Sequence, residues 1–585
     1  MPRETVDAID RALGRAGDES SRGPVVVRAG VPHDLAGAVE VHTEDGRTIA
    51  CDGAIPADLG SGYHTVVDRS DAPRSLIVSP GRCPLPEQRR SFGIAVQLYA
   101  TRSRRSWGIG DLADLRALAG WATSLGASAL LVNPLHAPPP VTPQPASPYF
   151  PSSRRYRNPL YISVADVPGA ASVAGELEPL QRRAATLQRE PRIDRDSVHR
   201  LKIAALERVW ESTGDQPHLD RFIEADPGVE RYATHCALTE RHGACWHDWP
   251  GDLRHPHGGA VGRFRRENER RVRFHVWLQW LLEAQLRAAA EQVGLMHDVA
   301  VGFDPCGADA WEWQDQIAGG FAIGAPPDEF NTIGQDWGLA AFDPWRLRAA
   351  GYRPFIETIR SCLRHASSVR LDHVMGLFRL FWVPDGAAPS QGAYVRYPAS
   401  DLLDILALEA ERAGAYVVGE DLGTVEPGTR RELAARNVLS YRLLWFEETD
   451  ASRFPRKALC GVTTHDLPTV AGLWDGSDLQ TQLRLGLRPN VEATEAILSR
   501  VRDATSLAPS APIDDVVVAV YALIARAESM VLTATVEDML AVRERPNMPG
   551  TLDTRPNWSL ALPLVVEELV RAPLPRRVAA ELRRD

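Results

Sequence analysis

Three acidic side chains stand where apolar stretches of the sequence end and loops begin. Asp372 and Glu420 each follow directly on an apolar stretch, Asp466 comes shortly after another, and His373 and His465 adjoin two of these acids. The intervals between the acids each leave room for a complete strand and helix. A single acid in such a place is more simply explained as a structural ion-pair or capping residue, but three on separate strand ends favour a catalytic site.

Glycosyl transfer with retention is the chemistry that these acids suit. It needs one ionised carboxylate to attack the anomeric carbon, and a second, protonated carboxyl to release the leaving oxygen and then act as a base. Arg370 lies two residues before Asp372, so the two side chains share one face of a strand and Arg370 would keep Asp372 ionised. Crowding by like charge would raise the pKa of Glu420. Asp466 would then bind sugar hydroxyls and help to distort the ring.

Eight short strand patterns, most of them separated by helical patterns, would position these acids. Strand, helix and strand in succession form the unit of a parallel sheet, and eight strands fit a (β/α)8 barrel with its active site at the C-terminal strand ends. The predicted strands are 92–99, 128–133, 294–301, 368–372, 415–423, 440–446, 461–466 and 531–538.

The remaining sequence predicts two additions to the barrel. Residues 1–85 read as a polar leader and a small β-sandwich-like module, since strand patterns near 25–28, 38–42, 63–67 and 76–78 are separated by turn residues. The sequence leaves the function of this module open, but it favours a lid or a packing module over an independent sugar-binding module. The catalytic barrel then occupies 86–585, with an inserted loop and helical subdomain at about 138–290 after the second strand.

Composition narrows the class of protein. The 585 residues carry a net charge of -10, which argues against a nucleic-acid partner, and no apolar run is long enough to span a bilayer. The N-terminus is polar and has no apolar signal core. Seven scattered cysteines without a Cys-x-x-Cys predict reduced thiols in a cytoplasmic protein, in place of a disulfide frame or zinc site.

Two weaker motifs have simpler explanations. The spacing Gly108-x-Gly110-x-x-Ala113 loosely matches a dinucleotide fingerprint, but the next strand ends in Asn133 where that motif needs an acid. Asp111 as a helix N-cap explains the loop equally well. His255 and His257 lie in a Gly/Pro loop without a convincing set of further metal ligands. No cofactor and no metal are therefore expected.

Four longer segments carry a resemblance to a known family. Gly324-Ala-Pro-Pro-Asp-Glu-Phe-Asn-Thr-Ile-Gly-Gln-Asp-Trp-Gly338, Val369-Arg-Leu-Asp-His-Val-Met-Gly376, Val418-Gly-Glu-Asp-Leu-Gly423 and Thr464-His-Asp466 closely resemble the amylomaltase family. These are the 4-α-glucanotransferases, or disproportionating enzymes, relatives of the α-amylases, and the resemblance covers about 90 to 570. Two departures are the Leu-Pro-Thr after Asp466, where many members have Asn-Asp-Thr, and the leading 1–85, which the shortest members lack.

The resemblance implies a role for each matching residue. Asp372 would be the nucleophile, Glu420 the acid/base and Asp466 the transition-state stabiliser. The substrate-binding residues that it implies are Arg370, His465, Asp298, Asp328, Gln335, Trp337, Ser147, Tyr149 and Asn547, and His373 adjoins the nucleophile.

The expected function is a cytoplasmic 4-α-glucanotransferase. It would cut an α-1,4 link in a maltooligosaccharide or α-1,4-glucan and pass the donor segment to the 4-OH of another glucan or of glucose. The alternatives are an α-amylase-like glucan hydrolase and a catalytically silent glucan-binding protein, against which the intact acids argue. No nucleic-acid or membrane partner is expected, and no oligomeric state is predicted.

Overall fold

The computed structural model describes residues 3–14, 23–35, 37–69, 73–87, 90–213, 216–327, 334–423, 425–551 and 554–583. The chain divides into two compact units. The first comprises Met1–Glu87 with Trp313–Ser440, and the second comprises Gln88–Glu312 with Tyr441–Asp585.

Eight parallel strands close into a barrel, which confirms the (β/α)8 prediction. Their residues are mostly apolar and mostly buried, as is typical of parallel strands covered on both faces. The strands, in chain order, are β8 (Ser91–Val96), β9 (Ala129–Val132), β12 (Gly294–Val299), β15 (Ser368–Leu371), β18 (Tyr416–Gly419), β19 (Leu439–Leu443), β20 (Ala458–Gly461) and β21 (Val531–Thr535).

The seventh strand differs from its predicted position. The sequence predicts residues 461–466, but β20 ends at Gly461 and the following residues form a turn. The Thr463 hydroxyl donates to the Pro468 carbonyl at 2.8 Å, and the Leu467 amide donates to the Thr464 carbonyl at 3.2 Å. Asp466 therefore lies in this turn beyond the strand end.

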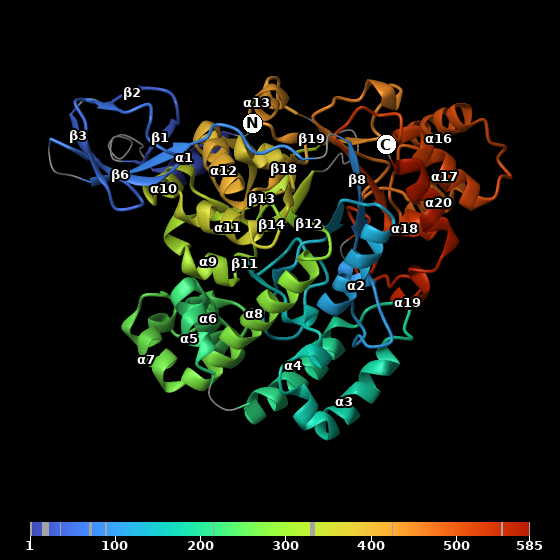
Figure 1. Ribbon diagram of the computed structural model, residues 1–585, viewed down its shortest axis with the longest axis horizontal. Helices are drawn as coiled ribbons and strands as arrows, with labels where there is room; N and C mark the ends of the chain where they lie inside the picture. The colour runs from blue at the N-terminus through green and yellow to red at the C-terminus, as the bar shows by residue number, and fades with distance from the viewer. Residues whose placement is uncertain are drawn as a thin grey trace. The chain divides into compact units, whose positions relative to one another are not determined.

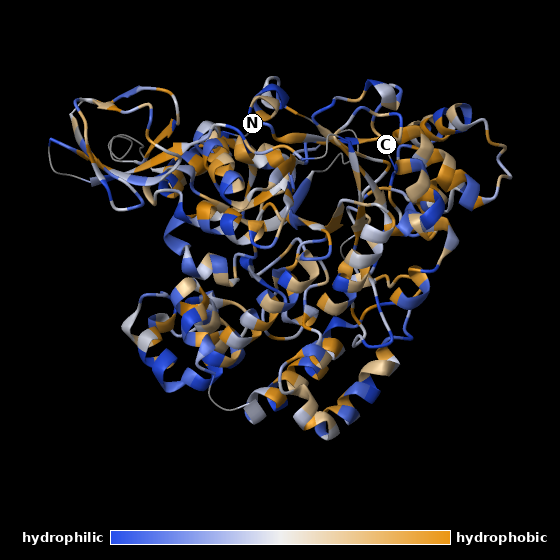
Figure 2. Cartoon of the chain, in the orientation of Figure 1, coloured by the Kyte–Doolittle hydropathy of each residue, from blue (hydrophilic) through white to orange (hydrophobic). Residues whose placement is uncertain are grey.

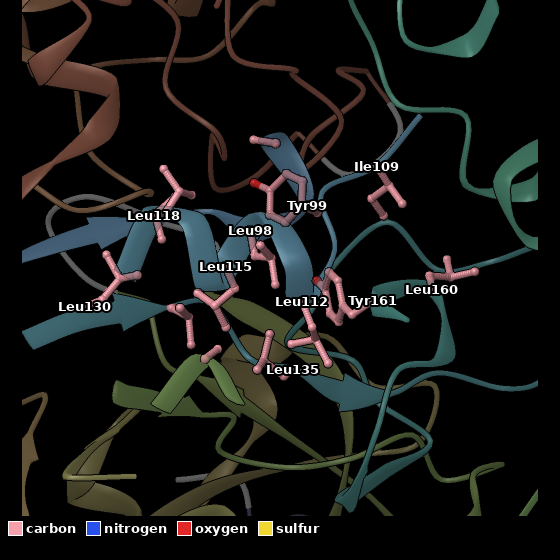
Figure 3. Close-up of a cluster of buried hydrophobic side chains, with 14 of the residues drawn as sticks. Leu98, Tyr99, Ile109, Leu112, Leu115, Leu118, Leu130, Leu135, Leu160 and Tyr161 are labelled. Carbon is pink, nitrogen blue, oxygen red and sulfur yellow. The ribbon is translucent and has the colours of Figure 1, made fainter. Parts of the chain in front are cut away.

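The loop before α2 (Leu112–Ser124) is shaped by a helix cap and a close backbone approach. Asp111 and Asp114 form a capping box, as the N-cap interpretation predicts. A Cβ at Gly110 would lie 2.0 Å from the Leu98 carbonyl oxygen, so only glycine fits there. Figure 3 shows Leu112 and Leu115 of this helix among the buried apolar side chains around β8 and β9.

Six helices make up most of the insertion after β9, as predicted for its later part. They are teal to green in Figure 1, and α7 is largely hydrophilic in Figure 2. Lys202 of the second of them is fully buried and donates to the Leu160 and Ile162 carbonyls at 2.6 and 2.8 Å. The helices are α3 (Ala174–Leu187), α4 (Arg195–Thr213), α5 (His218–Ala225), α6 (Gly228–His242), α7 (Gly259–Glu267) and α8 (Glu269–Ala290).

Further helices of the second unit follow the insertion and the later strands. Apolar residues of α16, α17 and α20 contribute to the same large core as β8 and β9. The helices are α9 (Ala308–Glu312), α14 (Val470–Trp474), α15 (Ser477–Arg484), α16 (Val491–Thr505), α17 (Ile513–Ile524), α18 (Val536–Met539), α19 (Val566–Leu569) and α20 (Pro573–Leu582).

The N-terminal part of the first unit begins with α1 (Arg3–Leu13) and continues as a β module, as predicted. A five-stranded sheet has the order β1 (Val25–Arg28), β7 (Pro73–Ser79), β6 (Gly62–Asp68), β3 (Ala38–His42) and β4 (Thr48–Ala50). A two-stranded sheet of β2 (His33–Asp34) and β5 (Ala54–Ile55) shares its core through Ile55. The separation of 1–85 as a module distinct from the barrel domain stays a prediction.

The rest of the first unit contains a further, four-stranded sheet and, among its described residues, four α-helices. The sheet has the order β14 (Gln335–Phe342), β13 (Ile317–Ala325), β16 (Arg379–Pro384) and β17 (Ala393–Arg396), all antiparallel. The helices are α10 (Pro344–Ala349), α11 (Arg353–Leu363), α12 (Ala399–Ala413) and α13 (Thr429–Ala435).

The prediction of seven reduced cysteines is wrong for one pair. Cys245 and Cys306 form a disulfide across a sequence separation of 61. Folding brings their two loops together, and a second contact joins the same loops: the Trp246 indole donates to the Pro305 carbonyl at 3.1 Å. Nothing in the spacing of the cysteines indicates this pairing. The remaining five cysteines are free thiols, four of them buried.

None of the helices in the described ranges is long and apolar enough to cross a membrane.

Candidate active site

The first group of site residues begins where β15 ends. Arg370 is a buried residue of the strand, and Asp372 follows its last residue. The Arg370 guanidinium nitrogen Nη1 lies 3.1 Å from Asp372 Oδ1. The Asp372 side chain is 22% exposed and that of Arg370 only 5%, so an incoming molecule can reach the carboxylate while its counter-charge stays shielded.

Glu420 follows β18 and is held by backbone donors. Its Oε2 accepts from the His373 amide at 3.0 Å and its Oε1 accepts from the Leu422 amide at 2.7 Å. Burial raises the pKa of Glu420, while Arg370 and the two amides act in the opposite direction. The raised pKa is in the predicted direction, but its main cause is burial; the like charge of Asp421 adds only a small part.

His373 joins these two acids to the sheet of the first unit. Its backbone is in the left-handed conformation, with φ of 46°, which turns the chain after Asp372. Its ring meets Trp337 edge-on at 5.4 Å between centroids, and the Trp337 indole donates to Gln335 Oε1 at 3.2 Å. Burial lowers the pKa of His373, Asp372 raises it and Arg379 lowers it, so the neutral imidazole is favoured.

The structure thus brings together the predicted site residues of the first unit. Asp328 lies outside the described residues. We call the group the Asp372 cluster: Arg370, Asp372, His373, Glu420, Gln335 and Trp337.

A second group gathers around the turn after β20. Asp466 Oδ1 accepts from the Asn547 side-chain amide at 2.6 Å, and the His465 ring nitrogen Nε2 lies 3.4 Å from Oδ2. The Asp466 backbone carbonyl accepts from Arg545 at 2.7 Å. The Asp466 side chain is 43% exposed, so its carboxylate is oriented by neighbours and open to solvent on another side.

Aromatic packing links Asp466 to residues from the loops after β9 and at the end of β12. The Tyr149 hydroxyl donates to Asp298 Oδ2 at 2.6 Å, and the Tyr149 amide donates to the Ser147 hydroxyl at 3.2 Å. The Tyr149 and His465 rings lie 5.1 Å apart. The Asp466 cluster comprises Ser147, Tyr149, Asp298, His465, Asp466 and Asn547, all predicted from the sequence.

Sequence reasoning missed three residues that adjoin the Asp466 cluster. Trp558 packs against Tyr149 at 5.3 Å and against His465 at 5.0 Å, and Arg545 binds the backbone of Asp466. Glu537 is buried, and its burial, with a smaller contribution from Asp538, raises its pKa to about 7 although the charge of His465 lowers it. The sequence offers one indication of two of these residues: Arg545 and Trp558 lie in the same loop as the predicted residue Asn547.

Both clusters contain carboxylates and histidines. In the described part of the chain, however, no group of three or more His, Cys, Asp or Glu side chains is arranged to hold a metal ion. His255 and His257 are both exposed in their loop, with ring centroids 5.7 Å apart.

Known proteins are similar to this chain in sequence and in fold. A family model described as 4-alpha-glucanotransferase matches residues 96–565. A 4-alpha-glucanotransferase of Mycobacterium bovis is 42% identical over 583 residues, covering 90% of this chain and 80% of the relative. One of Haemophilus influenzae is 31% identical over 570 residues, covering 86% and 81% respectively. The crystal structure of amylomaltase from Corynebacterium glutamicum matches with a TM-score of 0.87 and 31% identity, covering 100% of this chain and 96% of that one. The chain belongs to the 4-alpha-glucanotransferase family.

Proposed function

We propose that Asp372, Glu420 and Asp466 perform the glucan transfer of this 4-alpha-glucanotransferase. In the first step Asp372 attacks the anomeric carbon of the donor and forms a glycosyl ester, while Glu420 gives its proton to the leaving 4-oxygen. In the second step Glu420 takes the proton from the 4-OH of an acceptor, whose oxygen displaces Asp372. Two inversions at one carbon give retention, and both carboxyl groups return to their starting states.

The contrast between the two carboxyl groups of the Asp372 cluster is the observation that carries this proposal. Asp372 is partly exposed and paired with Arg370 at 3.1 Å, which favours the ionised form that a nucleophile needs. Burial raises the pKa of Glu420, which favours the protonated form that a general acid needs. Two acids whose environments separate their protonation states are the mark of an acid/base pair.

Asp466 is proposed to stabilise the positive charge that develops on the sugar ring. Its carboxylate is held by Asn547 and lies beside His465, and it keeps an exposed side for a substrate. A carboxylate fixed before the reaction stabilises developing charge without reorganisation.

Maltooligosaccharides and longer α-1,4-glucans are the proposed substrates. Trp337 and Tyr149 offer aromatic faces, which suit the apolar faces of sugar rings. Polar groups that would bind hydroxyls are Arg370, His373, Gln335, Ser147, Asp298, His465 and Asn547, and we assign Asp328 to the same task from its motif.

Incubation with maltotriose tests this function. We expect glucose together with maltopentaose and longer glucans, analysed by chromatography. Maltose and glucose without longer products would show that the protein is a glucan hydrolase and not a transferase. No product at all would favour a silent glucan-binding protein.

The variant Asp372→Asn tests the assignment of the nucleophile. We expect it to abolish turnover while retaining maltotriose binding in calorimetry, because the amide cannot form the glycosyl ester. Turnover equal to that of the unmodified protein would refute the assignment.

We further propose that the protein works in the cytoplasm, without nucleic-acid or membrane partners. Five of the seven cysteines are free thiols, as is common in a reducing compartment. Cell fractionation tests this location: recovery of the protein with cytoplasmic enzymes is expected, and recovery in a secreted or membrane fraction would contradict it.

A further inference from the structure

The sheet that follows Asp372 presents an exposed aromatic side chain that the reaction does not yet use. Tyr394 lies on β17 and is 38% exposed, whereas its neighbours Ala393 and Val395 are buried. Few large apolar or aromatic side chains of the described residues are this exposed. An exposed tyrosine is an amphipathic surface, with an apolar ring and a polar tip.

The ring of Tyr394 is held in one orientation by two neighbours. The Arg379 guanidinium carbon lies 4.0 Å from the ring centroid, within the range of a cation–π contact. Phe381, its partner in the β16–β17 register, meets the ring at 5.2 Å and 72°. A ring fixed in this way loses little conformational freedom when a ligand stacks on it, which favours binding.

Two arginines near the ring, Arg379 and Arg396, pair with Glu426 in the loop after Glu420. Glu426 lies six residues after Glu420 in the chain. Its Oε2 lies 3.6 Å from Arg379 Nε, and its Oε1 accepts from Arg396 at 2.9 Å. The side chains of Arg379 and Glu426 are 21% and 28% exposed, so both can form hydrogen bonds with hydroxyl groups of a ligand.

The same arginine links the ring to the segment that follows the nucleophile. β16 begins at Arg379, a few residues after Asp372, and the charge of Arg379 acts on His373. An extended glucan bound with its reacting unit at Asp372 would therefore carry its more distant units toward this hairpin.

We propose that Tyr394, with Arg379 over one face of its ring and Glu426 beside Arg379, is an outer binding site for a distal glucose unit of a long α-1,4-glucan, which uses the opposite face. The inference rests on the proposed role of Asp372. The apolar face of the sugar stacks on the ring, and its hydroxyls bind the charged groups beside it. This site selects for chain length, because a trisaccharide does not fill it and a longer glucan does.

The test compares KM values for maltoheptaose and maltotriose in transfer assays of the full chain. For Tyr394→Ala we expect the ratio of the KM for maltoheptaose to the KM for maltotriose to rise about 5- to 10-fold, the loss expected for one aromatic stacking contact. Tyr394→Trp keeps an aromatic face and should keep the wild-type ratio. Trp345→Ala removes another exposed aromatic side chain of the same unit, 46% exposed on α10, and should leave the ratio unchanged.

A ratio within twofold of wild type in Tyr394→Ala would overturn the outer site, and so would an equal rise of both KM values. Tyr394→Leu, which keeps apolar volume without an aromatic face, replaces the alanine variant if thermal unfolding shows that the latter is not folded. Failure of the unmodified protein to make longer glucans from maltotriose would instead refute the proposed transfer itself, so the two failures are distinguishable.

Discussion

At the scale of single residues, Arg370 acts on both carboxyl groups that we propose to be catalytic. It lies 3.1 Å from Asp372, and its charge opposes the burial that raises the pKa of Glu420. One buried guanidinium therefore favours the ionised form of the proposed nucleophile and keeps the proposed general acid from becoming too weak to give up its proton. This position explains why a strand buried on both faces contains an arginine.

Substitution Arg370→Met should lower kcat/KM for maltotriose transfer by about 10²- to 10³-fold, the usual loss for one preorganised electrostatic group. It should also move the alkaline limb of the pH profile to higher pH. The general acid must be protonated, so activity falls as the pH rises through its pKa. Loss of a positive neighbour raises that pKa, and the fall in activity therefore occurs at higher pH.

The pH dependence of kcat/KM measures both effects, and Arg270→Met, at an exposed arginine of α8, is the matched control. An alkaline limb that stays in place would show that Arg370 does not act on the general acid.

At the scale of elements, the junction of β21 and α18 buries two adjacent acids. Burial raises the pKa of Glu537 to about 7 and that of Asp538 to about 6. Asp538 has partners, since it accepts from the Val470 amide at 2.8 Å and the Tyr521 hydroxyl at 2.8 Å. Glu537 is the group whose ionisation the fold opposes more strongly.

Glu537 should therefore make the protein less stable as the pH rises. Its pKa is about 7 when folded and near the ordinary 4.5 when unfolded, so the folded state binds more protons between these values. Stability is full below pH 4.5 and is lost as the pH rises through 7. Glu537→Gln, measured by denaturant unfolding, should gain about 2–3 kcal/mol relative to wild type between pH 4.5 and pH 8. A stability difference that is constant over this range would contradict the buried acid.

The Cys245–Cys306 disulfide is a second feature at this scale that should affect stability. It joins the loop after α6 to the loop after β12 across 61 residues. Reduction, or Cys306→Ser, should lower the free energy of unfolding by about 2–4 kcal/mol in chemical denaturation. Cys51→Ser changes a free thiol and serves as the control. Equal stability of the oxidised and reduced protein would mean that the bond adds nothing to the fold.

Particular residues show how far the sequence could predict these elements. Val369 to Asp372 could be placed, because Val369 and Leu371 alternate with Arg370 and Asp372 as residues on the two faces of a strand do. The seventh strand was placed late, because the turn through Asp466 is also rich in β-branched residues. Trp558 and the Cys245–Cys306 pair could not be found, since they depend on contacts between loops that are far apart in sequence.

At the scale of the whole molecule, several polar contacts hold the N-terminal module on α12 within the first unit. Arg28 lies 3.1 Å from Asp404, the Ser79 hydroxyl donates to the Asp404 carbonyl at 2.6 Å, and the Tyr63 hydroxyl donates to Glu409 at 2.6 Å. Beneath them Ile77 of β7 packs with apolar residues of α10, α11 and α12. These contacts favour a packing module over a mobile lid.

Deletion of residues 1–85 should therefore destabilise the first unit. It would expose the side of α12 that Ile77 covers and leave the carboxylates of Asp404 and Glu409 without their N-terminal partners. We expect lower soluble yield, increased binding of a hydrophobic dye and a melting temperature lowered by several degrees, since the loss of only 1 kcal/mol shifts Tm by about 2–4 °C in large domains. Ile77→Ala, with an expected cost of about 2–4 kcal/mol, separates the packing contribution from the loss of the module as a whole. A truncated protein with wild-type melting temperature and transfer activity would show instead that the rest of the chain folds and works without the module.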